Sequence, residues 1–195
     1  MADSRELIKL ASGEHALFGY GSLLSIESLE RTLGRKYTGP FVVTGLSGWR
    51  RTWDVAMPDS RFHYQESNGE WVVPERTLYL NIRPVEGSSI NGVVFVVRDA
   101  ELEAYDKREW IYDRVAVNNQ LEDLRVEGGT AWAYSAKPEY LLEPPDSPRL
   151  AAVRQTYLNF LSDGHKRLGA EFERRYYAST DAVPRHLVID DKPRQ

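Results

Sequence analysis

The stretch from Leu17 to Leu24, with the sequence LFGYGSLL, places the strongest constraint on how this chain can fold. A short apolar run ends at two glycines that flank a tyrosine, and a helical pattern from Ile26 to Leu33 follows closely. This order predicts a strand, a tight glycine loop and a helix. Glycine permits backbone conformations closed to other residues and close approach of another molecule. Successive N–H groups in such a loop, facing a helix N-terminus, can bind an anion, although an ordinary strand–helix turn has the same pattern.

Two better-known glycine motifs do not fit this loop. A dinucleotide-binding fingerprint needs a third glycine where Leu24 stands. A nucleophile elbow needs glycines two residues before and two residues after its serine. Ser22 has Tyr20 and Leu24 at those positions, so it is a poor candidate for a nucleophile.

Composition excludes several classes of function. The 195 residues are enough for one domain with a substantial core, and the formal net charge of −4 argues against nucleic acid as the main partner. The chain has no cysteine, which excludes disulfides, thiolate catalysis and cysteine metal sites. No metal is expected, because the histidines lack ligand spacing; they are His15, His63, His165 and His186. No apolar run has the length of a membrane span and no signal-peptide core is present, so we expect no membrane partner and a cytoplasmic location.

The order of predicted elements indicates an α+β fold. Six or seven short strands fall between residues 16 and 135, interrupted by helices over 25–33 and 99–111 and followed by helices over 148–164 and 168–178. This order predicts a mixed, barrel-like sheet rather than a doubly wound one. We expect a loose N-terminal arm, a sheet domain, C-terminal helices packed on the same domain, and a tail, covering residues 1–14, 15–136, 137–182 and 183–195.

The predicted helix over 99–111 carries a carboxylate on its apolar side. Leu102, Tyr105, Glu109 and Tyr112 are spaced three, four and three residues apart, which places them on one helical stripe. If Glu109 is buried with that stripe, desolvation raises its pKa and fits it to exchange protons near neutral pH. The alternative is that Glu109 lies at the edge of the stripe and its carboxylate still contacts water. Asp106 lies at that edge, and a cap or an ion pair with Lys107 or Arg108 is its better interpretation.

Three segments together resemble the γ-glutamylcyclotransferase-like superfamily (AIG2/GGCT-like domain). Tyr20–Leu23 matches its Tyr-Gly-Ser loop, and Gly48–Arg51 resembles the segment after the first helix in glutathione-degrading members. Gly92–Phe95 followed by Tyr105–Val117 is similar to its second motif, a strand and then a helix with Asp and, three residues later, Glu. The similarity covers roughly residues 15–135.

The resemblance implies a small mixed β-barrel with flanking helices and an enzyme, a transferase or lyase, that releases 5-oxoproline from a γ-glutamyl amine, amino acid or peptide. The substrate's α-amine attacks its own γ-carbonyl, so the protein needs no nucleophile and no cofactor and acts largely by holding the chain bent. The implied roles are a catalytic Glu109 that moves the protons and loop amides that hold the α-carboxylate. Tyrosines would orient the substrate or stabilise the oxyanion. The substrate-binding residues are then Tyr20, Gly21, Ser22, Leu23 and Tyr112, to which we add Tyr134 from its position on a predicted strand.

Three alternatives remain open at this stage. A non-catalytic module on the same fold could bind a small carboxylate through the glycine loop. A structural domain could pair through its C-terminal helices, and the sequence leaves a homo-oligomer open. The segment Trp49–Trp53 (WRRTW) mixes aromatic and basic residues in a way that can stack on nucleic acid, but in an acidic chain a strand or pocket rim is the better interpretation.

Overall fold

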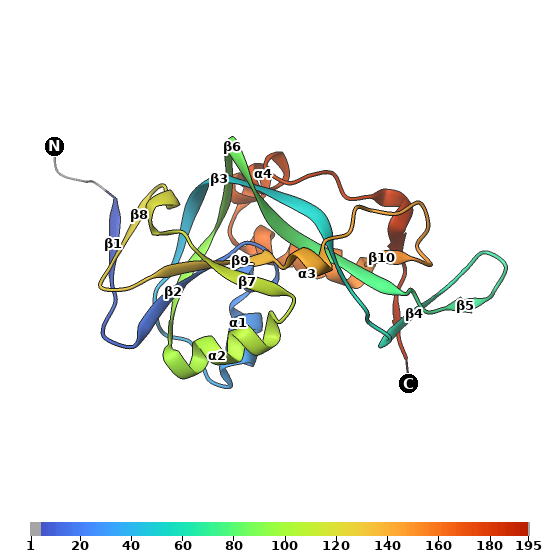
Figure 1. The fold of residues 1–195 in the computed structure, drawn as a ribbon, viewed down its shortest axis with the longest axis horizontal. Helices are drawn as coiled ribbons and strands as arrows, with labels where there is room; N and C mark the ends of the chain where they lie inside the picture. The colour runs from blue at the N-terminus through green and yellow to red at the C-terminus, as the bar shows by residue number, and fades with distance from the viewer. Residues whose placement is uncertain (1–4, 195) are drawn as a thin grey trace.

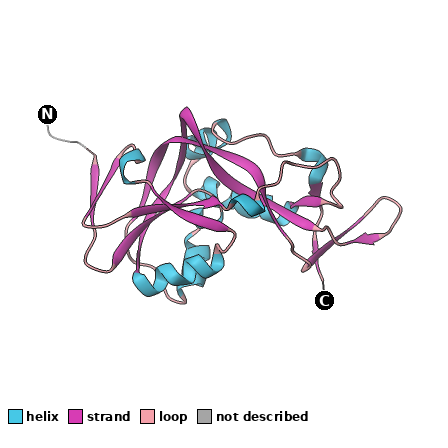
Figure 2. Cartoon of the chain, viewed as in Figure 1, coloured by secondary structure: helices cyan, strands magenta, loops and turns pink. Residues whose placement is uncertain are grey.

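The computed structural model describes residues 5–194, which form an α+β fold around a seven-stranded mixed sheet (Figures 1 and 2). The strands are β1 (Glu6–Lys9), β2 (Glu14–Gly19), β3 (Phe41–Met57), β4 (Phe62–Gln65), β5 (Trp71–Val72), β6 (Arg76–Arg98), β7 (Tyr112–Ala116), β8 (Leu124–Glu127), β9 (Ala131–Ala136), β10 (Ala151–Arg154), β11 (Val188–Ile189) and β12 (Lys192–Pro193). The helices are α1 (Ile26–Leu33), α2 (Asp99–Arg108), α3 (Gln155–Arg167) and α4 (Ala170–Ala178), with 3₁₀ turns η1 (Ser22–Leu24), η2 (Asn118–Gln120), η3 (Pro138–Tyr140) and η4 (Arg185–Leu187).

The mixed sheet is confirmed, but no closed barrel is seen. The strand order is β11-β10-β6-β2-β9-β7, with β3 also paired to β6, so pairing within residues 5–194 forms an open path. β2 is antiparallel to β6 and parallel to β9, which makes the sheet mixed. In the same part of the chain, no helix has the length and apolar character needed to cross a bilayer.

Strands β3 and β6 form one long antiparallel ribbon of 17 and 23 residues. The sequence predicts that one strand ends at residues 47–48 and that another ends at a turn over 85–91. Both predictions are wrong, because β3 and β6 continue through these residues. The ladder instead contains an irregularity: Ser47 pairs with Ser89 and Trp49 with Pro84, so residues 85–88 leave the register opposite Gly48. Gly48 has φ +82°, a conformation that glycine adopts easily. A bulge of this kind bends a strand without ending it.

The two ends of the described chain are part of the structure rather than a loose arm and tail. Strand β1 pairs in parallel with β8, while β11 pairs with β10 and β12 with β4. The helix predicted over 148–164 begins only at Gln155, because residues 151–154 form strand β10 beside β6. Ala151, Ala152 and Val153 are fully buried there, so sheet pairing outweighs their helical pattern. Residues 1–4 and 195 lie outside the described range.

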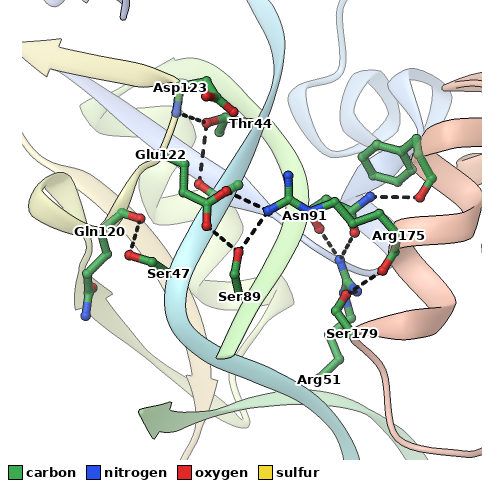
Figure 3. A network of polar contacts seen from close by, with 12 residues as sticks. Thr44, Ser47, Arg51, Ser89, Asn91, Gln120, Glu122, Asp123, Arg175 and Ser179 are labelled. Atoms are coloured by element: carbon green, nitrogen blue, oxygen red, sulfur yellow. Dashed lines mark hydrogen bonds and ion pairs between the residues drawn. The ribbon is translucent and has the colours of Figure 1, made fainter. Parts of the chain in front are cut away.

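A buried arginine joins the C-terminal helices to the sheet (Figure 3). Arg51 of β3 is fully buried, and its Nη1 donates to Ser179 Oγ at 3.0 Å while its Nη2 donates to Asn91 Oδ1 at 3.0 Å. Its guanidinium also lies 4.0 Å from the centre of the Tyr176 ring in α4. Burial lowers the pKa of Arg51 to about 10, which leaves it charged at neutral pH. The same figure shows Arg175 of α4 donating to Ser89 of β6 at 2.8 Å.

The contact between β2 and β6 gives a stability prediction. A Cβ at Gly92 would lie 2.5 Å from the Gly19 carbonyl oxygen and against the Phe18 ring, so Gly92→Ala should lower the free energy of unfolding by about 1–3 kcal/mol. At Gly164, inside α3, a Cβ would lie 3.6 Å from Leu24 Cβ, which is ordinary contact. Gly164→Ala should therefore be neutral or stabilising by about 0.5–1 kcal/mol. Urea unfolding checks both variants, and equal stability of the two would contradict the close packing at Gly92.

Candidate active site

The glycine loop begins where β2 ends and turns back on itself. A Cβ at Gly19 would lie 2.7 Å from Leu23 Cβ, so only glycine permits this close approach. The chain then passes through η1 into α1, where Ser25 is the N-cap and its Oγ accepts from the Ser28 N–H at 3.3 Å. Gly34, with φ +66°, ends α1. The predicted strand, loop and helix are thus confirmed.

The loop presents three unused backbone donors. The Leu24 N–H donates to the Gly21 carbonyl at 3.0 Å. No hydrogen bond between residues 5 and 194 uses the N–H groups of Gly21, Ser22 or Leu23. Backbone N–H groups left without a partner near a helix N-terminus are suited to an anion. The loop can therefore accept a carboxylate without first breaking an internal bond.

Glu109 reaches the same place from the end of α2. The helix ends at Arg108, not at the predicted residue 111, because the next residues turn into β7; Glu109 is the C-cap and its N–H donates to the Tyr105 carbonyl at 2.7 Å. The predicted stripe nevertheless faces inward, since Leu102 and Tyr105 are buried and the Glu109 side chain is 16% exposed. Burial raises the pKa of Glu109, and the neighbouring Arg108 opposes part of this rise.

Arg108 is a site residue that sequence reasoning missed. Its Nε lies 3.0 Å from Glu109 Oε1, and its Nη2 donates to Ser22 Oγ and to Ser28 Oγ, both at 2.9 Å. It therefore connects the carboxylate to the glycine loop and α1. A basic residue next to Glu109 was the available signal. The predicted pairing of Asp106 with Lys107 or Arg108 is wrong, because Asp106 pairs with Arg114 at 3.1 Å.

The residues predicted from the sequence line one small pocket of about 30 Å³. Those residues are Tyr20, Gly21, Ser22, Leu23, Glu109, Tyr112 and Tyr134. This pocket has room for roughly two waters, and so for a small group such as a carboxylate. It shares Ser22, Glu109, Tyr112 and Tyr157 with a larger cavity of about 730 Å³. The two together form a small inner compartment with a wide outer one.

The tyrosines of the inner pocket are oriented to accept hydrogen bonds. Tyr20 donates its hydroxyl proton to the Tyr134 carbonyl, and Tyr112 donates to the Leu80 carbonyl, each at 2.8 Å. Tyr134 donates to Asp106 Oδ1 at 2.9 Å. Burial raises the pKa of all three hydroxyls, which keeps them neutral. Each hydroxyl already donates its single proton to a protein oxygen, so only the lone pairs of its own oxygen are free. These lone pairs suit a cationic group better than an oxyanion.

Tyr157 of α3 is a second lining residue missed in the sequence. It lines both compartments, and its hydroxyl would lie 3.6 Å from a Cβ placed on Gly21. Its ring packs edge-on against Tyr79 of β6, with centroids 5.2 Å apart. In the sequence, Tyr157 shares a helical spacing with Val153 and Leu161, which predicts an apolar face. Nothing in that spacing connects α3 to the glycine loop. Among residues 5–194, no group of three or more metal-binding side chains is present.

Comparison of the sequence with models of protein families and with curated proteins gives no match. Several solved structures are similar in fold. A γ-glutamyl cyclotransferase superposes with a TM-score of 0.58 at 16% identity, over 88% of this chain and 91% of that one. The uncharacterized human protein loc79017 gives 0.51 at 17% identity, over 88% and 92%. YkqA from Bacillus subtilis gives 0.59 at 16% identity, over 89% of this chain, which spans 56% of YkqA. This protein therefore has the γ-glutamylcyclotransferase-like fold.

Proposed function

We propose that the protein is a γ-glutamylcyclotransferase-type enzyme that releases 5-oxoproline from a γ-glutamyl compound. One observation carries the proposal: the unused N–H groups of Gly21, Ser22 and Leu23 and the largely buried carboxylate of Glu109 belong to residues that line one pocket. An anion site and a proton-transfer group are what intramolecular cyclisation needs, since the substrate supplies its own nucleophile. The fold similarity to a γ-glutamyl cyclotransferase supports the same reaction class.

The inner pocket suits the α-carboxylate of the substrate. Its volume of about 30 Å³ admits a small charged group and little else, and three of the residues that line it have N–H groups with no partner among residues 5–194. With the carboxylate held at Gly21–Leu23, the α-ammonium group would lie toward Glu109 and the tyrosine hydroxyl oxygens. The γ-amide would then extend into the larger cavity that shares Ser22, Glu109, Tyr112 and Tyr157 with the inner pocket.

Glu109 would carry the protons in both directions. The ionised carboxylate takes a proton from the α-ammonium group, and the resulting amine attacks the γ-carbonyl carbon to close a five-membered ring. The second proton of the attacking nitrogen is lost as the ring forms. The leaving nitrogen gains one proton as the amide C–N bond breaks and a second when it departs as an ammonium group. Two protons thus pass in total from the α-nitrogen to the leaving amine. A pKa raised by burial fits one carboxylate to both tasks.

A binding module that holds a small carboxylate without turnover is the alternative on this fold. Such a module would need the loop amides alone. A second, buried carboxylate beside them would repel the ligand and cost desolvation energy. The position of Glu109 in the inner pocket therefore favours an enzyme.

Replacement of Glu109 tests the proton-transfer role. Glu109→Gln keeps the shape of the side chain and removes its basicity, so 5-oxoproline release from a γ-glutamyl substrate should fall by about 10²–10⁴-fold. Glu103→Gln, on an exposed position of the same helix, is the matched control and should retain full activity. Product is measured by chromatography, with circular dichroism to verify folding. Unchanged turnover in a folded Glu109→Gln variant would contradict the assignment. Ligand-induced thermal shifts without product from the wild type would favour the binding module.

The Arg108 contact predicts a shift in pH dependence. Turnover requires ionised Glu109, so kcat/KM should fall as the pH drops through the pKa of Glu109. Arg108 stabilises the carboxylate, and therefore Arg108→Gln should raise that pKa further and move the acid limb of the profile to higher pH. A carbon-13 NMR titration of the Glu109 carboxyl gives the same comparison without turnover. Arg125→Gln in β8 makes an equal charge change near Glu127 and should leave the limb in place. An acid limb at the same pH in the wild type and in the Arg108→Gln and Arg125→Gln variants would rule out this role of Arg108.

A further inference from the structure

The γ-carbonyl of the substrate has no assigned hydrogen-bond donor in the proposed reaction. Attack by the α-amine moves the π electrons of this carbonyl onto its oxygen, and the negative charge that develops there is stabilised by a donor held in place. With the α-carboxylate in the inner pocket and the leaving amine in the larger cavity, the γ-carbonyl would lie between the two compartments. A donor for it should therefore come from the residues that line both, which are Ser22, Glu109, Tyr112 and Tyr157.

Two of these four residues cannot serve as the donor. Glu109 is the proposed proton-transfer group and must be ionised when the reaction begins. Tyr112 donates its single hydroxyl proton to the Leu80 carbonyl at 2.8 Å. The other two tyrosines predicted from the sequence likewise donate their protons to protein oxygens. Ser22 and Tyr157 remain.

The hydroxyl of Tyr157 still has its proton to donate. Among residues 5–194, no oxygen or nitrogen accepts a hydrogen bond from it. Burial raises the pKa of Tyr157, which keeps the hydroxyl protonated at neutral pH, and a hydrogen bond from the Leu80 backbone opposes part of this rise. The Tyr157 oxygen would lie 3.6 Å from a Cβ placed on Gly21, at the start of the glycine loop. The free proton is therefore available next to the loop that would hold the substrate.

Packing from two strands holds the Tyr157 ring in place. Tyr157 lies in the first turn of α3, directly after β10, whose residues Ala151 and Ala152 pair with β6. Its ring packs edge-on against Trp53 of β3 and Tyr79 of β6, with centroids 6.3 and 5.2 Å away. A donor fixed in this way loses little freedom when a substrate binds, which is the condition for stabilising an oxyanion.

Ser22 is the weaker of the two remaining candidates. Its Oγ accepts a hydrogen bond from Arg108 at 2.9 Å, and its own proton has no acceptor among residues 5–194. A phenol is more acidic than an aliphatic alcohol, so Tyr157 is the stronger hydrogen-bond donor. Ser22 also belongs to the loop that would bind the α-carboxylate, and that carboxylate is the nearer acceptor for its hydroxyl.

We propose that Tyr157 is a catalytic residue that donates a hydrogen bond to the γ-carbonyl oxygen as the ring closes. The new C–N bond forms to the α-nitrogen, the carbonyl π electrons move to the oxygen, and Tyr157 keeps its proton throughout. The carbonyl re-forms when the C–N bond to the leaving amine breaks, and Glu109 carries the protons. This inference rests on the proposed function and adds a residue from outside the segment 15–135 that resembles the family.

Removal of one oxygen atom tests this role. Tyr157→Phe keeps the ring and should lower kcat by about 10²–10³-fold, because the donor acts on charge that exists only in the transition state. KM should change by less than about threefold. The compounds tested are γ-glutamyl-β-alanine, γ-glutamyl-propylamine and γ-glutamylcysteinylglycine, and the variants are compared on the one that the wild type turns over fastest. Tyr177→Phe, the same change at an exposed position of α4, is the matched control and should retain full activity.

Binding measured without turnover separates this role from ground-state binding. In the Glu109→Gln background, Tyr157→Phe should change the Kd of the same compound by less than about threefold in isothermal titration calorimetry. Retained affinity also shows that the site is intact. Thermal denaturation verifies that each variant is folded.

The outcomes distinguish this inference from the proposed function. A wild-type kcat in Tyr157→Phe would overturn the inference while the proposed function stands. A rise in KM and Kd with unchanged kcat would also overturn it, because Tyr157 would then bind the substrate equally in the ground and transition states. The same holds for a loss of kcat in Ser22→Ala that Tyr157→Phe does not share. If none of the three compounds yields 5-oxoproline, the proposed function fails and the inference fails with it.

Discussion

The rest of the structure depends on the hydrogen bonds that the buried guanidinium of Arg51 donates. Its Nε donates to the Tyr20 carbonyl at 3.1 Å, within the glycine loop, and its other donors meet oxygens of Asn91 and of the end of α4. All its hydrogen-bond partners among the described residues are uncharged oxygens. A buried charge without a counter-ion costs several kcal/mol unless such a shell is held in place. The shell therefore links the loop, the long ribbon and the C-terminal helices into one unit.

The glycine loop and Glu109 could be predicted from the sequence because their signals are local. A strand that ends at Gly19, with an N-cap at Ser25 and a stop at Gly34, involves a few neighbouring residues, and the structure has all three features. The stripe that carries Glu109 inward also follows from helical spacing, although α2 ends just before it. That these two segments share a pocket was implied only by the family resemblance.

The remaining features depend on contacts between distant segments, and spacing cannot reveal those. Residues 151–154 have a helical pattern but form a strand because β6 and β11 offer partners on either side. Strands β3 and β6 likewise continue on both sides of the bulge opposite Gly48, because each strand has the other as its pairing partner there. Arg108 and Arg154 look like ordinary surface cations in the sequence. Their buried contacts form only when α2 meets the glycine loop and β10 brings Arg154 to the Phe62 ring.

In the proposed reaction, the two ends of a γ-glutamyl substrate lie in different compartments of the site. Under the proposed function, backbone amides of the inner pocket would bind the α-carboxylate, and the larger cavity would receive the leaving group. Glu109 lines both compartments, and in the proposed reaction the protons would pass there.

A crystal structure of the Glu109→Gln variant with γ-glutamyl-β-alanine bound would test the central claim most directly. The proposed arrangement predicts an α-carboxylate oxygen within hydrogen-bond distance of the N–H groups of Gly21–Leu23, with the α-nitrogen next to residue 109. It would be contradicted by an α-carboxylate bound outside the inner pocket with the α-nitrogen directed to solvent, or by a γ-glutamyl group bound outside both compartments.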